Sequence, residues 1–172
     1  LPITGTATVC EQNVTILSTI TGSSGTWSSS DPSVATVDTT IGNVTGIVSG
    51  TATITYTAYS GCYVVREVTV IPTPAAITGS SSVCVGNLSL CPAGTSTLTS
   101  TTTGGTWTSA STSVATIGTG GIVTPVATGT TTISYTLSTG CTRTAEVTVT
   151  PAPSAITGPG IVCVGSNAIF SN

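Results

Sequence analysis

The chain has 172 residues, which suits one domain or two small ones, and carries a net charge of −3. Only 4 % of its residues are charged, against roughly 25 % in ordinary globular domains, and it contains neither His nor Lys. This composition excludes an imidazole base, a histidine-bound metal, a Schiff-base amine and a basic groove for nucleic acid. No apolar run approaches the ~18–20 residues of a membrane span, so we expect no membrane insertion.

Thr and Ser replace the missing charge, with 41 and 23 residues. Long Thr-rich tracts can be disordered, but 38 % of this chain is hydrophobic and its mean hydropathy is +0.49. The composition therefore predicts a folded chain with a structural or binding role outside the cytoplasm.

Internal repetition is the strongest pattern in the sequence. One segment occurs three times, as ITGTATVC (3–10), ITGSSSVC (77–84) and ITGPGIVC (156–163). A later segment occurs twice, as GTATITYTAYSGC (50–62) and GTTTISYTLSTGC (129–141). Because the copies keep the same order, the chain reads as a slice of a longer tandem array.

The repeats predict one domain at 1–74 and a second at 75–153. Residues 154–172 are then the first strands of a third repeat, or a strand shared with a neighbouring domain or subunit. The junctions read IPTPAAITG (71–79) and TPAPSAITG (150–158). Their alternating prolines favour a stiff extended path between neighbours, or simply block pairing at a strand edge.

Period-two alternation predicts an all-β fold. In chain order, apolar residues alternate with Thr in the segment 51–58, with Glu67 and Thr69 in the segment 67–70, and again in the segment 133–137. Turn sequences at 40–43 and 118–121 separate the strands. Each repeat would hold six or seven short strands in two antiparallel sheets packed face to face. We expect four aromatic side chains in these cores: Trp27, Tyr56, Trp107 and Tyr135.

Six cysteines indicate an oxidising compartment. Cys10 and Cys62 hold the same places in the first repeat as Cys84 and Cys141 in the second, so we expect the pairs Cys10–Cys62 and Cys84–Cys141. Cys91 lies in an insertion of the second repeat, and Cys163 opens the third. The partner of Cys163 would normally lie past Asn172, and Cys91 would pair with a local or neighbouring thiol; the alternative is an inter-repeat or inter-chain bond at these cysteines. Zinc is disfavoured because no CxxC pair or His is present.

The two segments 25–57 and 105–136, which share Trp-Ser/Thr-Ser and Val-Ala-Thr elements, resemble the bacterial immunoglobulin-like domain, group 2. With its VCVG openings, the chain is similar to the Cys-bearing form in giant repetitive surface proteins of the Bacteroidetes. The resemblance implies tandem immunoglobulin-like sandwiches on a secreted or cell-surface protein, typically an adhesin or filament, and no catalytic residue. Two departures are Pro125, which stands where the first repeat has Gly46, and the insertion around Cys91.

The few acids do not form a recurring site. Glu67 and Glu146 are equivalent positions near Arg66 and Arg143, which suits a solvated strand face with a weak ion pair. Asp31 and Asp38 could bracket a weak Ca²⁺ site, but the second repeat has Ser111 and Gly118 there, so we expect no metal and no cofactor.

Glycan attachment is a separate expectation. Asn13, Asn43 and Asn87 begin N-x-S/T sequences, and Thr39 lies in an Asp-Thr-Thr sequence similar to the O-glycosylation sequon of Bacteroidetes.

These observations predict a non-enzymatic structural module of an extracellular filament or cell-surface adhesin stalk. Its partners would be further copies of itself, as a homopolymer or a longer tandem array, and glycans. The alternative is a carbohydrate- or ligand-binding adhesin module. Exposed aromatics would distinguish the two, and Tyr59 and Tyr63 flank Gly61-Cys62 in the first repeat only.

Overall fold

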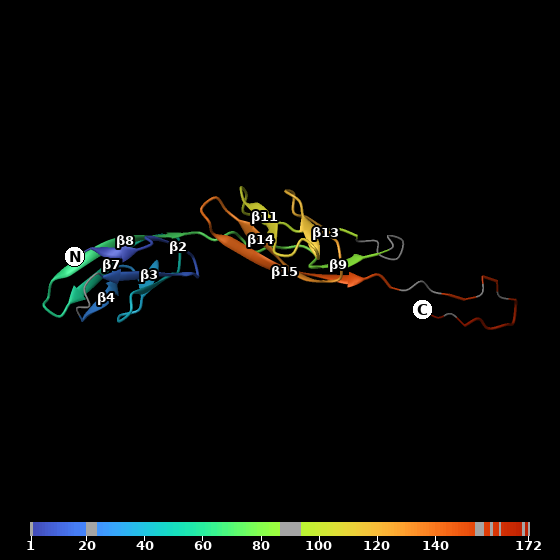
Figure 1. The fold of residues 1–172 in the computed structure, drawn as a ribbon, viewed down its shortest axis with the longest axis horizontal. Coiled ribbons are helices and arrows are strands. Elements are labelled where there is room, and N and C mark those ends of the chain that lie inside the picture. Colours follow the sequence, from blue (N-terminus) through green and yellow to red (C-terminus); the bar gives the residue numbers. More distant parts are fainter. Residues whose placement is uncertain are drawn as a thin grey trace. The chain divides into compact units, whose positions relative to one another are not determined.

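The computed structural model describes residues 2–19, 24–86, 94–153, 157–158, 160–161, 163–169 and 171. Asn87 and Cys91 lie outside the described residues. The described part is all-β, as the alternation predicted, and forms two compact units (Figure 1). The first is Leu1–Thr73 with Thr139–Cys141, and the second is Pro74–Ser138 with Thr142–Asn172. Among the described residues no helix is long and apolar enough to cross a membrane.

The first unit contains two four-stranded sheets. One has the order β1 (Ile3–Gly5), β3 (Val14–Thr19), β6 (Asn43–Gly46) and β5 (Ala35–Val37). The other has the order β2 (Thr8–Cys10), β8 (Tyr63–Ile71), β7 (Gly50–Ala58) and β4 (Gly25–Ser29).

The second unit repeats this arrangement over its described residues. One sheet has the order β10 (Ser96–Thr97), β13 (Ile122–Pro125) and β12 (Ala115–Ile117). The other has the order β11 (Thr106–Ser109), β14 (Gly129–Thr136), β15 (Thr142–Pro151) and β9 (Ser82–Val85). Pro125 keeps the register of Gly46, since it pairs with Ala115 as Gly46 pairs with Ala35.

The first strand of each repeat changes sheets at a glycine. In the first unit β1 pairs with β3, and the chain then crosses to pair β2 with β8. Gly5, at the crossing, has a φ of +117°, and a Cβ there would lie 2.3 Å from the Ile16 carbonyl oxygen. Gly79 is the equivalent residue, with a φ of +123°. Only glycine adopts this conformation without strain, which explains the recurring Ile-Thr-Gly sequence.

The same crossing corrects the prediction of wholly antiparallel sheets. β2 runs parallel to β8, and β9 runs parallel to β15, while all other strand pairs of the described residues are antiparallel. Parallel strands need a long connection, and here most of the repeat lies between its first and last strands. Alternation along a strand carries no information about the direction of its neighbour.

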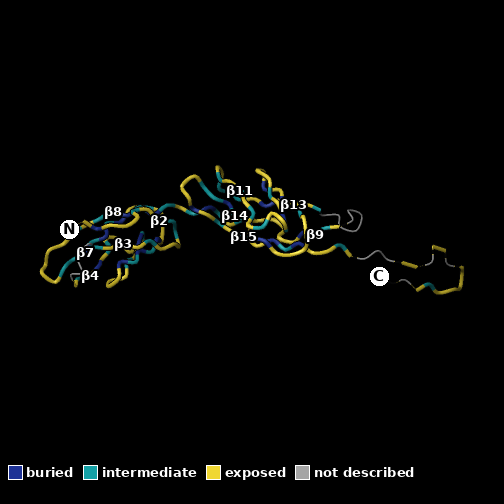
Figure 2. The backbone as a smooth tube through the Cα atoms, in the orientation of Figure 1, coloured by how far each residue is buried: buried dark blue, intermediate teal, exposed yellow. Residues whose placement is uncertain are grey.

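The cores contain the apolar residues that the alternation selected (Figure 2). Along β7 the side chains of Ala52, Ile54 and Tyr56 are buried, and on β14 Ile133 and Tyr135 are buried. Trp27 is buried too, whereas Trp107 is half-buried and packs against the edge of the second core. Each Trp packs on the Tyr of its own repeat, with ring centroids 4.9 Å apart for Trp27–Tyr56 and 4.6 Å apart for Trp107–Tyr135.

A glycine two residues before each Trp provides space for that Tyr ring. A Cβ on Gly105 would lie 2.4 Å from Cζ of Tyr135, and one on Gly25 would lie 2.6 Å from Cζ of Tyr56. In the second unit the N–H of Gly105 donates to the Tyr135 hydroxyl, which donates to the Thr102 carbonyl, both at 2.8 Å. The recurring Gly-Thr-Trp sequence is therefore a packing requirement of the facing Tyr.

We predict that Gly25→Ala and Gly105→Ala each lower the free energy of unfolding by about 1–3 kcal/mol, because the methyl group would overlap a ring held by the core. Gly120→Ala is the matched control, since a Cβ there meets nothing within 4 Å and its φ is not positive. Urea denaturation followed by Trp fluorescence measures all three. Equal stability of Gly105→Ala and Gly120→Ala would contradict the packing argument.

Candidate functional site

Cysteines lie near both ends of the last strand of each repeat. Cys62 immediately precedes β8 in the β7–β8 hairpin, whereas Cys10 pairs in parallel register with Ile71 at the far end of β8. Ile71 is nine residues after Cys62, a span of roughly 30 Å along an extended strand. Cys141 and Cys84 have the same relation across β15, where Cys84 pairs with Thr150.

This geometry corrects both predicted disulfides. A disulfide requires Cα atoms about 4.4–6.8 Å apart, so neither Cys10–Cys62 nor Cys84–Cys141 forms within its repeat. Instead Cys10 is bonded to Cys141, with their Cα atoms 5.7 Å apart and a sequence separation of 131. The bond joins a first-strand cysteine of the first repeat to the hairpin cysteine of the second.

The other cysteines differ in state. Cys84 is disulfide-bonded as well. Cys62 and Cys163 are free and exposed thiols. Cys141, the repeat equivalent of Cys62, is completely buried where its bond is made. Cysteines at equivalent positions of the two repeats therefore differ in exposure: the disulfide-bonded Cys141 is buried, whereas the free Cys62 is exposed.

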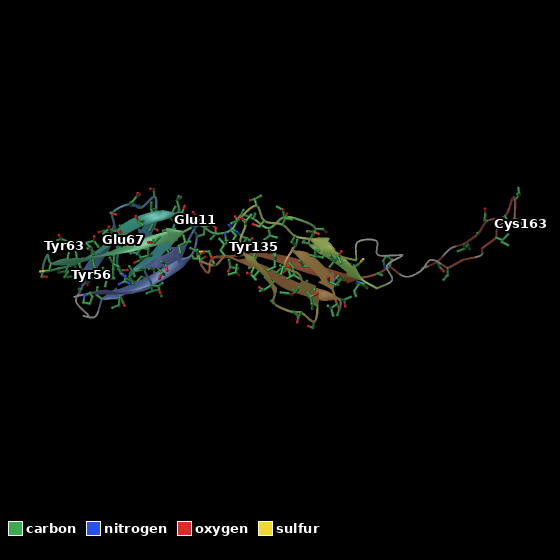
Figure 3. The ribbon with its side chains drawn as sticks, turned by 90° about the horizontal axis from the view of Figure 1, so that it is seen from above. Glu11, Tyr56, Tyr63, Glu67, Tyr135 and Cys163 are labelled. Carbon is green, nitrogen blue, oxygen red and sulfur yellow. A yellow bond between two sulfur atoms is a disulfide. The ribbon has the colours of Figure 1, made fainter. Side chains whose placement is uncertain are left out.

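The hairpin that carries Cys62 exposes two aromatic side chains. Tyr59 is 80 % exposed and Tyr63 is 68 % exposed, and Figure 3 labels Tyr63 on this hairpin. Gly61, between Tyr59 and Cys62, has a φ of +84° and closes the turn. The second repeat has Ser138 and Thr142 at the aromatic positions, so this patch of Tyr59, Cys62 and Tyr63 occurs on one repeat only.

The two arginines hold backbone carbonyl groups. Arg66 donates from Nη1 to the Ile3 carbonyl at 2.8 Å and from Nη2 to the Gly5 carbonyl at 2.9 Å. These bonds hold β1 where the first strand crosses between sheets. Arg143 donates from Nε to the Pro74 carbonyl at 3.2 Å. Both cations thus have a structural role, and Glu67 and Glu146 are exposed on their strands.

The exposed carboxylates stabilise their own turns. The hydroxyl and backbone N–H groups of Ser33 donate to Asp31, which lowers the pKa of that carboxyl below 3.8. The hydroxyl and N–H groups of Thr40, with the N–H of Ile41, lower the pKa of Asp38 in the same way. Glu11 accepts the N–H of Ser49 at 2.8 Å. No group of three metal-ligating side chains occurs among the described residues.

The candidate glycan positions differ in access. Asn13 and Thr39 are exposed in loops, whereas Asn43 is half-buried on β6. Glycan attachment at these positions stays a prediction.

Two shallow hollows lie in the second unit, and neither has a charged lining. One, of about 180 Å³, is lined by Trp107, Tyr135 and the turn at Thr119–Gly120. The other, of about 400 Å³, is lined by Cys84, Thr124, Pro125 and their neighbours. Hydroxyl, aromatic and thiol-derived groups without a base provide no arrangement for general acid–base chemistry.

Residues 4–69 match the family of bacterial Ig-like domains, group 2. The match confirms the resemblance drawn from the recurring Trp and Val-Ala-Thr elements. No curated protein sequence matches the chain.

Among solved structures the chain is similar to the surface layer protein SbsC, domains 1-6, with 24 % identity and a TM-score of 0.33, over 91 % of this chain and 27 % of that one. It is similar to a C-terminal fragment of intimin, solved with the intimin-binding domain of the translocated intimin receptor, with 17 % identity and a TM-score of 0.47, over 92 % and 66 %. It is also similar to murine CEACAM1b, with 12 % identity and a TM-score of 0.31, over 87 % of this chain and 98 % of that one. This chain therefore spans less than two thirds of the first two proteins.

We predict that Cys10→Ser and Cys141→Ser each lower the free energy of unfolding by about 2–5 kcal/mol under oxidising conditions, because each removes the same long covalent loop. The double variant should lose little more than either single one. Cys62→Ser, which removes an exposed free thiol, is the control and should change stability little. Guanidinium denaturation measures the four proteins, and additive losses at Cys10 and Cys141 would contradict the pairing.

We predict a stability loss in acid that depends on Asp31 and Asp38. Their pKa values are lower in the folded chain than the ordinary 3.8, so both add stability above pH 3.8 and lose it as pH falls through the folded values. The melting temperature of Asp31→Asn/Asp38→Asn should fall less steeply over that range than that of the parent chain. Parallel curves would show that these turns do not contribute.

Proposed function

We propose that the chain is a structural module of an extracellular filament or cell-surface adhesin stalk, built from tandem, disulfide-stabilised Ig-like repeats. The observation that carries this proposal is the Cys10–Cys141 bond, which covalently joins one sequence repeat to the next. A bond inside one sandwich would stabilise only that sandwich. A bond from repeat to repeat also resists extension of the array.

The start of a third repeat supports an array that continues. In the first repeat the hydroxyls of Thr4 and Ser18 lie 3.0 Å apart, and these residues pair between β1 and β3. Thr157 and Ser171 form the same antiparallel bridge, with hydroxyls 3.2 Å apart and the same sequence spacing of 14 residues. We propose that 154–172 is the opening of a repeat like the first.

The strand surfaces also suit assembly. The outward-facing positions of β7 are Thr residues, and those of β8 include Tyr63, Val65 and Glu67. Glu67 is the one charge among them, so neighbouring copies would meet little charge repulsion. Hydroxyl-rich faces are at the same time the candidate carriers of O-linked glycan. With two arginines and no lysine, the chain also offers few sites to trypsin-like proteases outside the cell.

A non-catalytic role is consistent with the chemistry of the described residues. The carboxylates of Asp31 and Asp38 are held in their own turns, and both arginines bind backbone carbonyls. No described Ser or Thr has a histidine to activate it, because the chain has none.

The exposed Tyr59 and Tyr63 favour a second candidate function, a carbohydrate- or ligand-binding module at the cell surface. It would act on the first repeat alone, since Ser138 and Thr142 replace the aromatics in the second. A double variant, Tyr59→Ser/Tyr63→Thr, would abolish such binding on a glycan array and leave the fold intact.

Electron microscopy of the native protein tests the structural role. We predict regular fibres with a repeating axial rise, because stiff repeats joined by covalent bonds propagate one geometry. A sample kept in reductant is the control and should give shorter or irregular fibres. Isolated, flexible two-domain particles in the oxidised sample would overturn the proposal.

A further inference from the structure

The first half of β8 is an open edge of its sheet. On one side β7 pairs with β8 from Tyr63 to Val70, whereas on the other side β2 pairs with it only from Thr69 to Ile71. Among the described residues no further strand pairs with β8. The segment from Tyr63 to Glu67 therefore has a neighbouring strand on one side only.

The hydrogen bonds around β8 fix which of its backbone groups face the open edge. Ala58 donates its N–H to the Cys62 carbonyl, so the even-numbered residues of β8 bond to β7. Thr69 donates its N–H to the Ala7 carbonyl beside β2, so the odd-numbered residues face the other way. The N–H and C=O groups of residues 63, 65 and 67 consequently point away from β7, and no described residue bonds to them.

Other edges of the same sandwich are occupied. The outer carbonyls of β1 accept hydrogen bonds from Arg66, and on β4 the N–H of Trp27 donates to the Thr39 carbonyl at 3.0 Å. Natural sheets cover their edges, or interrupt them with proline and charge, because a free edge pairs readily with a strand of another chain. The open segment of β8 contains no proline, and its one outward charge is Glu67.

The residues with free backbone groups also carry exposed side chains. Tyr63 is 68 % exposed and Val65 is 55 % exposed, and Glu67 is exposed on the same face of β8 (Figure 3 labels Tyr63 and Glu67). The second repeat has Thr142 and Thr144 in place of the two apolar side chains. Apolar side chains beside free backbone groups favour the addition of a strand, and only the first repeat combines the two.

The open edge is a property of the repeat and does not depend on where the chain begins. In the second repeat, which has a whole repeat before it, β9 pairs with β15 only from Thr148 to Pro151. Thr144 and Glu146 are exposed there, and among the described residues their outward backbone groups have no partner. A preceding repeat therefore leaves this part of the last strand open.

The length of the open edge selects one antiparallel pairing with a second copy. All of its outward backbone groups are paired only when Val65 lies opposite Val65 of the second copy and Tyr63 lies opposite Glu67. Each such pair exchanges two N–H···O bonds, which gives about six bonds in all. A register centred on Glu67 would place two carboxylates opposite each other and would meet Thr69, whose N–H is already bound.

The ends of the paired segment fit this register as well. Opposite Thr69 of the second copy lies Gly61, where the chain has turned back toward β7 and the Gly61 N–H donates to the Ala58 carbonyl. The β2 strand of the second copy thus begins where the hairpin leaves the edge. On the exposed face the phenol of Tyr63 lies beside the carboxylate of Glu67, and the two Val65 side chains lie beside each other.

We propose that the open edge of β8 joins a second copy of this chain by antiparallel strand pairing centred on Val65, so that one continuous sheet runs through the first repeats of both copies. The proposal rests on the proposed function, for which it names a lateral contact between neighbouring arrays. The occupant is a second copy because the edge complements itself in length, hydrogen bonding and charge. Contacts repeated along two arrays act together, so a weak single contact is sufficient.

Analytical ultracentrifugation of the full chain with Cys62→Ser and Cys163→Ser, which removes the two free thiols, tests the contact. This parent should show a monomer–dimer equilibrium at concentrations up to about 1 mM. Val65→Pro removes an outward N–H and should weaken dimerisation about tenfold or more. Thr144→Pro makes the same change at the equivalent residue of the second repeat and should leave dimerisation unchanged.

A second variant separates loss of the contact from loss of the fold. Val65→Lys keeps the backbone N–H but places two cations opposite each other, so it should also prevent dimerisation. Circular dichroism should show the same strand content for this variant as for the parent. Amide hydrogen exchange at residues 63, 65 and 67 of the parent should slow as its concentration rises, because these N–H groups become bonded.

A cysteine at the centre of the pairing tests the register. Opposite residues in such a pair have Cα atoms about 5.5 Å apart, within the range of a disulfide. Val65→Cys in the parent should therefore give a covalent dimer with oxidised glutathione on a non-reducing gel. Thr144→Cys is the matched control and should stay monomeric.

A parent that stays monomeric up to that concentration, or equal dimerisation of the parent and Val65→Pro, would overturn the contact. So would equal yields of covalent dimer from Val65→Cys and Thr144→Cys. Regular fibres in the electron microscope alongside any of these results would leave the structural function standing. Dimerisation through β8 with isolated particles in place of fibres would overturn that function and leave the contact standing.

Discussion

Parallel pairing between the first and last strands of each repeat determines where the cysteines lie. β2 enters beside the end of β8, and β9 enters beside the end of β15. A first-strand cysteine is thereby placed one strand length away from the hairpin cysteine of its own repeat. Because roughly 30 Å cannot be closed by a disulfide, a first-strand cysteine and the hairpin cysteine of its own repeat do not bond to each other, and Cys10 is bonded to Cys141 instead.

Small residues make this arrangement possible. Gly5 and Gly79 allow the first strand to leave one sheet for the other, and Arg66 holds the crossing by binding the Ile3 and Gly5 carbonyls. Gly25 and Gly105 allow the Tyr rings to pack under the Trp rings. A chain with little charge and few aromatics therefore depends on backbone geometry, and on one aromatic pair per repeat, to specify its fold.

The surface and the cysteines together account for the unusual composition. Thr and Ser occupy the outward-facing positions of β7 and β14, so these strands need few charged residues to remain solvated. The exposed apolar groups of the first hairpin stand beside a free thiol, and the matching hairpin of the second repeat is bonded and lacks the aromatics.

The sequence by itself determined the all-β class and the core positions, because alternation along β7 and β14 reports directly which side chains face inward. Its resemblance to the bacterial Ig-like domains, group 2, is matched over residues 4–69. The sequence predicted that Trp107 lies in the core, but its side chain is only half-buried and packs against the core edge, because burial there depends on neighbouring turns. Strand direction and the disulfide were decided only by the tertiary structure. The repeats identified which cysteines are equivalent, but equivalence in sequence does not say how far apart two cysteines lie in the folded chain. The register of Cys10 against Ile71 separates Cys10 from Cys62, and the three-dimensional structure brings Cys10 within bonding distance of Cys141.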